Sequence, residues 1–280
     1  MRQLEPLLGD IAFGEGPRWR DGRLYFSDFY RHRVMSVTPE GRAEEIVQVP
    51  AQPSGLGWDP DGRLLIVSML DRRLLRLEGS ELVAQADLSG VATGPCNDML
   101  VDETGRAYVG NFGFDRHKGE ARRAAALALV GPDGRVEAAA HDLEFPNGTV
   151  LTPDGRTLIV AETFGARLTA FRRDGDGRLS ERRVWADLPG VRPDGICLDA
   201  EGCVWVTDPA GDAVLRVREG GEVIDRVSTG SRHSFACMLG GANRRTLFVI
   251  TNVGSGPDIA SERAGRIETV RVDVPAAGLP

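Results

Sequence analysis

The chain has no excess of basic residues and no long hydrophobic run. Its 280 residues include 34 Lys and Arg against 41 Asp and Glu, a net charge of −7, which argues against a nucleic-acid-binding surface. No window approaches a membrane-spanning helix, and the first ten residues, MRQLEPLLGD, lack the basic start, apolar stretch and cleavage site of a signal peptide. We therefore expect a soluble, cytoplasmic protein that binds neither nucleic acid nor a membrane.

Several familiar reactive motifs are also missing. The four cysteines (Cys96, Cys197, Cys203 and Cys237) lack paired C-x-x-C spacing, so free thiols in a reducing compartment are expected rather than a zinc site or a disulfide. There is no H-E-x-x-H motif, no P-loop and no nucleophile elbow around Ser54 or Ser68. The sequence therefore offers none of these catalytic sets as an alternative to the site described below.

Helical periodicity is nearly absent, and a repeat takes its place. Six segments align as two short apolar runs joined by a turn, most of them containing Asp-Gly or a close relative: EGPRWRDGRLYFSDF (15–29), SGLGWDPDGRLLIVSM (54–69), NDMLVDETGRAYVGNF (97–112), NGTVLTPDGRTLIVAET (147–163), DGICLDAEGCVWVTDP (194–209) and the degenerate ACMLGGANRRTLFVITN (236–252). Each reads as a β-hairpin. In the fourth copy Asp154-Gly155 is the expected hairpin turn, whereas Asn147-Gly148 lies at a strand entrance.

Weaker alternating stretches after each hairpin supply a third and a fourth strand. Four strands in each of six repeats predict an all-β, six-bladed propeller of antiparallel strands. The helix-compatible stretch 122–130 falls at the third strand of its repeat, and residues 4–11 are expected to complete the last blade and close the ring. We expect residues 1–280 to form one propeller domain with a central metal channel.

The first position of each inner strand is rich in oxygen-bearing side chains. In order, these positions are Glu15, Ser54, Asn97, Asn147, Asp194 and Ala236. Equivalent positions of a propeller converge on its axis, so two carboxylates and two amides are expected around one centre, where a hard divalent cation relieves their repulsion. The alternative is that they are ordinary solvated or turn-forming polar residues. Because no His or Cys occupies the register, calcium is favoured, with Zn²⁺, Mn²⁺ and Mg²⁺ as alternatives.

A second polar register lies at the end of the second strand of each hairpin. Its members are Asp28, Ser68, Asn111, Glu162, Asp208 and Thr251. They are interpreted either as groups that orient the ligands or as polar strand ends that meet water, and Asn111 is taken as a candidate substrate contact. His233, just before the sixth inner strand, is a further candidate at the channel mouth.

Four of the aligned segments resemble the regucalcin/gluconolactonase family of metal-dependent lactonases, which includes the senescence-marker proteins. These segments are GEGPRW (14–19), CNDMLVDETGR (96–106), FPNGTVLTPDGRTLIVAET (145–163) and RPDGICLDAEGCVWVTD (192–208). The resemblance implies that Glu15, Asn147 and Asp194 bind one catalytic divalent ion, that Asp194 is also the general base, and that Asn97 contacts substrate. An acidic substrate contact of the family falls near Asp115. In the sugar-lactonase members an Arg stands where this chain has Pro95.

The expected activity is therefore hydrolysis of a small-molecule lactone, a sugar lactone or a related cyclic ester. The ion would polarise the lactone carbonyl as a Lewis acid and activate a water, so no covalent nucleophile is needed. Two alternatives stay open at this point. They are organophosphate hydrolysis on the same metal platform and a propeller that binds a ligand or partner protein without catalysis.

Overall fold

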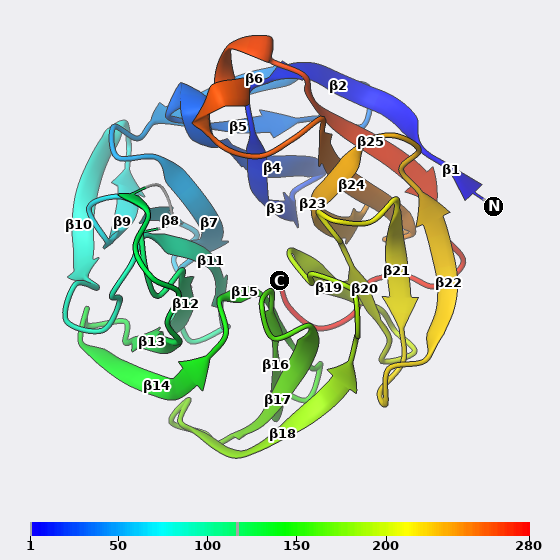
Figure 1. Cartoon of the computed structure of the whole chain (residues 1–280). Coiled ribbons are helices and arrows are strands. Elements are labelled where there is room, and N and C mark those ends of the chain that lie inside the picture. The colour runs from blue at the N-terminus through cyan, green and yellow to red at the C-terminus, as the bar shows by residue number, and fades with distance from the viewer. Residues whose placement is uncertain (1, 116–117) are drawn as a thin grey trace.

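The computed structural model describes residues 2–115 and 118–280, and most of them lie in β-strands and tight turns. Six sheets form a ring of blades, and the chain passes from each blade to its neighbour in order (Figure 1). The inner strands contact one another around the ring and enclose a central channel. The six-bladed propeller predicted from the repeat is confirmed.

Each blade starts with the strand nearest the channel and continues outwards. Blade 1 contains β3 (Gly14–Arg20), β4 (Arg23–Asp28), β5 (Arg33–Val37) and β6 (Ala43–Gln48), and blade 2 contains β7 (Pro53–Trp58), β8 (Leu64–Ser68), β9 (Arg73–Glu78) and β10 (Glu81–Asp87). Blade 3 contains β11 (Cys96–Val101), β12 (Ala107–Asn111), β13 (Ala125–Val130) and β14 (Val136–Leu143), and blade 4 contains β15 (Pro146–Leu151), β16 (Thr157–Glu162), β17 (Arg167–Arg173) and β18 (Leu179–Asp187). Blade 5 contains β19 (Ile196–Leu198), β20 (Val204–Val206), β21 (Ala213–Val217) and β22 (Val223–Ser228), and blade 6 contains β23 (His233–Gly240), β24 (Thr246–Asn252) and β25 (Gly265–Arg271).

The two ends of the chain meet in blade 6. Its outer strand is β2 (Glu5–Ile11), which pairs antiparallel with β25, so the ring closes as predicted. One strand departs from the repeat. The two-residue β1 (Arg2–Gln3) pairs parallel with β22 and adds a fifth strand to blade 5. The short helices η1 (Phe29–Arg31) and η3 (Pro257–Glu262) contact each other. Within residues 2–115 and 118–280, no helix has the length and apolar character needed to cross a membrane.

Two glycines of blade 4 show why the repeat has its two turn-like dipeptides. Gly155 has φ +68° in the tight turn between β15 and β16, a conformation that glycine adopts without steric cost. Gly148 lies inside β15, where a Cβ atom would stand 2.5 Å from the backbone nitrogen of Ile196. Gly148 therefore allows the inner strands of blades 4 and 5 to approach closely, and it does not form a hairpin turn.

The core consists of apolar side chains packed between successive blades. Trp205, Phe26 and Phe248 are among its largest fully buried side chains. The four cysteines are free and buried, and burial raises the pKa of the Cys96 thiol to about 12. This thiol stays protonated at neutral pH, which suits a packing role.

The C-terminal segment after β25 runs back under the ring to the axis, where the C-terminus lies in Figure 1. Leu279 exchanges two backbone hydrogen bonds with Leu151, at 2.9 and 3.0 Å, and Ala277 donates one to Leu198. Both partners stand at the far ends of inner strands, opposite the residues predicted to bind a metal. The tail thus covers part of one end of the channel, and the predicted site lies at the other.

Candidate active site

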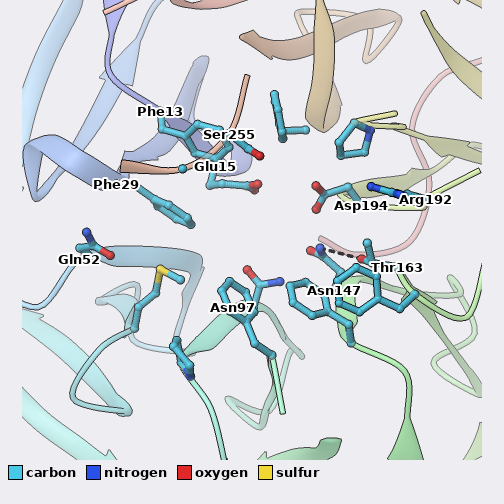
Figure 2. A pocket seen from close by; sticks show the side chains of 18 of the residues that line it. Phe13, Glu15, Phe29, Gln52, Asn97, Asn147, Thr163, Arg192, Asp194 and Ser255 are labelled. Atoms are coloured by element: carbon cyan, nitrogen blue, oxygen red, sulfur yellow. Dashed lines mark hydrogen bonds between the residues drawn. The ribbon is translucent and has the colours of Figure 1, made fainter. Parts of the chain in front are cut away.

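A cavity of about 330 Å³ opens at the end of the channel where the inner strands begin. Four predicted residues from four blades lie together in it: Glu15 on β3, Asn97 on β11, Asn147 on β15, and Asp194 just before β19. We call these four residues the floor of the cavity. Figure 2 shows the carboxylates of Glu15 and Asp194 directed toward each other, with the two amides beside them. The structure therefore brings together the predicted oxygen-rich register.

The inner strands approach closely because a glycine follows three of the floor residues. A Cβ atom on Gly16 would lie 2.6 Å from the carbonyl oxygen of Ser54, and one on Gly195 would lie 2.6 Å from Ala236 Cα. Gly148 makes the same kind of approach to blade 5. The small residues of the repeat therefore bring the floor side chains near the axis.

Asn97, the floor residue of blade 3, is followed by Asp98, whereas each of the other three floor residues is followed by glycine. Asp98 forms a buried ion pair at 2.7 Å with Arg18 of blade 1, and its Oδ1 also accepts a hydrogen bond from Met99 N at 2.8 Å. Arg18 donates further bonds to the carbonyl oxygens of Pro17 and Met99. This pair joins blades 1 and 3, which are not neighbours in the ring.

The Glu15 carboxylate lies in an environment that disfavours its charge. Burial is the main cause that raises the pKa of Glu15 well above its usual range, and the neighbouring charges of Asp194 and Asp98 raise it further. The Gly16 N–H, which donates to Glu15 Oε2 at 3.1 Å, and the Arg18 guanidinium act in the opposite direction. Two buried carboxylates that repel each other form a site that a cation stabilises.

The amide of Asn147 is oriented by a short hydrogen-bond relay. Thr163 donates its single hydroxyl proton to Pro193 O at 2.8 Å, so it must accept the bond from Asn147 Nδ2 at 3.1 Å (Figure 2). This fixes which end of the amide carries oxygen. Asn147 Oδ1 is buried, and within the described residues it has no hydrogen-bond partner. A buried, oriented oxygen of this kind is suited to binding a cation.

The donor set as a whole fits a hard divalent ion. It comprises two carboxylates and the oriented Asn147 oxygen, with the Asn97 amide alongside. Asn97 Oδ1 faces the Ser54 hydroxyl at 3.5 Å, which leaves its NH₂ group toward the cavity. In the described part of the chain, no three His, Cys, Asp or Glu side chains cluster as a metal site by themselves. The Asn147 amide oxygen would therefore have to join the two carboxylates in the shell, and amide oxygens are typical ligands of calcium.

The second polar register has a role that the sequence did not specify. All six members are buried, so they are not strand ends that meet water. Asp28 Oδ1 accepts bonds from the backbone nitrogens of Ala12 and Phe13, at 3.0 and 3.1 Å. Glu162 Oε2 accepts one from Glu144 N at 2.7 Å, and Asp208 Oδ1 accepts one from Arg192 N at 3.1 Å. These carboxylates hold the backbone two or three residues before Glu15, Asn147 and Asp194.

Three predicted substrate contacts lie outside the set of described residues that line the cavity. Asn111 is buried. Its side-chain amide donates a hydrogen bond to Ala126 O and accepts one from Gly113 N, so both ends of the amide bond to backbone. Asp115 pairs with Lys118 at 3.0 Å in a surface loop. His233 begins β23 and is half-buried. Its Nδ1 is buried, and the described residues offer it no hydrogen-bond partner.

The cavity walls come mainly from two positions of the repeat that are absent from the predicted set. In five of the six blades the residue two before the inner-strand register position lines the cavity: Phe13, Gln52, Pro95, Phe145 and Arg192. In the same five blades the residue one after the second register also lines it: Phe29, Met69, Phe112, Thr163 and Pro209. The alignment of the copies is the signal that locates these walls.

The fold and site define a six-bladed propeller with an oxygen-rich centre at one mouth of its channel. Residues 13–253 match the family described as SMP-30/Gluconolactonase/LRE-like region. The chain belongs to this family, and the resemblance seen in its motifs is confirmed.

Individual relatives resemble the chain over nearly its full length. A protein of Pseudomonas putida named 6-deoxy-6-sulfogluconolactonase is 27% identical, over 96% of this chain and 94% of that protein. Regucalcin of Xenopus laevis is 26% identical over 88% of this chain and 84% of its own length. The crystal structure of a calcium-binding protein, regucalcin, from Agrobacterium tumefaciens has a TM-score of 0.83 at 22% identity, covering 100% of this chain and 97% of that one. That structural likeness supports the fold.

Proposed function

We propose that the protein is a lactonase that hydrolyses a cyclic ester with one divalent ion held by Glu15, Asn147 and Asp194. The observation that carries this proposal is the convergence of two buried carboxylates and an oriented, buried amide oxygen in the floor of a cavity. The names of the relatives indicate the reaction class, since one is a sulfogluconolactonase and the family name includes gluconolactonase. Calcium is the ion that this donor chemistry favours.

The reaction needs only water as co-substrate. The water oxygen forms a bond to the lactone carbonyl carbon, and the ring ester C–O bond breaks. The ring oxygen gains a proton and becomes a hydroxyl group of the product. The product is one hydroxy acid. No Ser, Cys or other covalent nucleophile is required, which agrees with the absence of the corresponding motifs from the sequence.

The floor residues take distinct roles in this proposal. A divalent ion, when bound, supplies Lewis-acid polarisation of the carbonyl and stabilises negative charge that develops on its oxygen. Asp194 accepts the proton of the attacking water as general base. The Asn97 NH₂ group, directed into the cavity, donates a hydrogen bond that orients the substrate. The phenylalanine-rich walls limit the access of bulk water around the reacting ester.

The reaction class is tested by measuring acid release from a panel of lactones and phosphotriesters with calcium-loaded protein. The proposal predicts turnover of at least one lactone at kcat/KM above about 10⁴ M⁻¹s⁻¹, the lower end of ordinary enzymes. Turnover of phosphotriesters with none of lactones would assign the metal platform to organophosphate hydrolysis. Binding of panel members without turnover of any would favour a non-catalytic propeller.

The metal site makes a separate prediction at Thr163. We expect Thr163→Val to weaken calcium affinity by about tenfold or more, because the Asn147 amide loses the bond that orients its oxygen. Isothermal titration calorimetry on both proteins measures the effect. Thr152→Val is the matched control, since the Thr152 hydroxyl donates to Asp154 in the β15–β16 turn at the other end of blade 4. Equal calcium affinity in wild type and Thr163→Val would contradict the assignment of Asn147 as a ligand.

A further inference from the structure

The walls of the cavity are unusually rich in phenylalanine. The chain has 10 Phe residues, and seven of them line this one cavity: Phe13, Phe29, Phe112, Phe114, Phe145, Phe164 and Phe235. They come from blades 1, 3, 4 and 6 or their adjoining loops, far apart in the sequence. Six of them belong to one buried cluster with Met69, and Phe164 packs against it. The side chains have been gathered by the fold around the floor, as Figure 2 shows for Phe13 and Phe29.

The rings support one another and form a preorganised surface. Phe13 packs edge-on against Phe235 with centroids 4.7 Å apart, and it lies 5.5 Å from Phe29. On the other side, Phe112 stacks on Phe145 at 4.4 Å. Such contacts hold aromatic side chains in fixed positions. A substrate therefore meets apolar walls whose shape exists before it binds.

Apolar side chains outnumber polar ones in the cavity walls above the floor. The hydroxyl of Thr163 is already engaged on both sides, with Pro193 O and Asn147 Nδ2. Arg192 and Ser255 line the cavity from exposed positions, and Tyr30 and Gln52 line it from half-buried ones. A ring that carries several hydroxyl groups would place most of them against phenylalanine, where they lose water without gaining a hydrogen bond.

We infer that the substrate is a lactone whose ring bears an apolar substituent, an aryl group or an alkyl chain, rather than a polyhydroxylated sugar lactone. This inference rests on the proposed lactonase function and assigns its substrate class. The ester group lies on the floor, and the substituent packs among the phenylalanine rings. Burial of the substituent raises kcat/KM, because each apolar group removed from water in a fitting pocket favours binding and the transition state.

The test compares matched lactones with calcium-loaded protein by continuous acid release. One set carries an alkyl chain or a phenyl group on a five- or six-membered lactone ring, the second is the unsubstituted rings, and the third is gluconolactone and its 6-sulfonated form. The expected result is a kcat/KM about 10²-fold higher for the substituted rings than for either other set. A preference below tenfold, or a preference for a sugar lactone, overturns the inference and leaves the lactonase assignment standing. Failure of all lactones overturns both.

Substitution of Phe29 gives an independent test of this substrate assignment. Phe29→Ser should lower the ratio of kcat/KM between the substituted lactone and gluconolactone about tenfold, whereas Phe29→Leu, which keeps the wall apolar, should retain most of it. Phe171→Leu is the control, because Phe171 is buried in a separate cluster of blades 3 and 4. It should change thermal stability without changing the ratio. An unchanged ratio in Phe29→Ser contradicts the placement of the substituent among these rings.

Discussion

Replacement of Asp194 by Asn is expected to lower kcat by about 10²-fold or more at saturating calcium. The substitution keeps an oxygen for the ion and nearly the same shape, but it removes the capacity to accept a proton from water, and loss of a general base costs about this much. Asp194 is buried in the cavity floor beside the other predicted ligands. The measurement is kcat on the best lactone of the panel, with metal affinity determined separately for the same preparation.

Glu15→Gln is the matched variant, because it also removes one carboxylate charge from the floor. Glu15 has no base role in the proposal, so this variant should bind calcium more weakly and recover much of its kcat once the ion is saturating. Equal recovery in Asp194→Asn would show that Asp194 acts only as a ligand. The water would then be activated without this carboxylate as its base.

Removal of the Asp98 side chain is expected to cause the largest loss of stability. Asp98→Ala leaves the Arg18 guanidinium buried without its partner, since the two side chains are only 8% and 6% exposed in the native pair. Breaking a buried ion pair by removing one member typically costs about 3 to 5 kcal/mol. The free energy of unfolding, measured by urea denaturation, should fall by that amount.

Two control variants distinguish the loss of a buried ion pair from the loss of any single charged side chain. Glu219→Ala removes the partner of Arg183 from a pair whose side chains are 56% and 50% exposed, and it should cost less than about 1 kcal/mol. The double variant Arg18→Met/Asp98→Ala should be more stable than Asp98→Ala alone, because no uncompensated charge remains in the channel. A loss for Asp98→Ala as small as that for Glu219→Ala would contradict the importance assigned to the buried Arg18–Asp98 pair.

The fold and the floor of the site are predictable because the repeat makes equivalent positions visible. Once the hairpins are aligned, Glu15, Asn97, Asn147 and Asp194 fall at one position, and the symmetry of a propeller places that position around its axis. The inner strands must approach closely for these residues to converge, and this approach is also encoded locally, in Gly16, Gly148 and Gly195. The arrangement of the floor residues can therefore be inferred from the repeat alone, without knowledge of contacts between residues far apart in the sequence.

Other features depend on contacts between blades, which no local pattern records. Arg18 and Asp98 are 80 residues apart and lie in blades that are not neighbours. The second register appears in the alignment, yet its polar character alone does not show that Asp28, Glu162 and Asp208 bind backbone before the floor residues. The positions that form the cavity walls are aligned too. Four of the ten named wall residues at these positions are Phe, but the others are Gln, Pro, Arg, Met and Thr, so the residue type varies from blade to blade and does not by itself mark a surface.

The most direct test of the account is a calcium titration of chelator-treated protein that follows acid release from the best lactone. We expect chelation to lower the rate by about 10²-fold or more, since Lewis-acid polarisation contributes several kcal/mol to such reactions. Added calcium should restore the rate with a half-saturation that equals the Kd found by calorimetry, and Glu15→Gln should shift both values together. A rate that is unchanged in excess chelator, with the protein shown to be free of divalent ions, would contradict metal-dependent hydrolysis at this site.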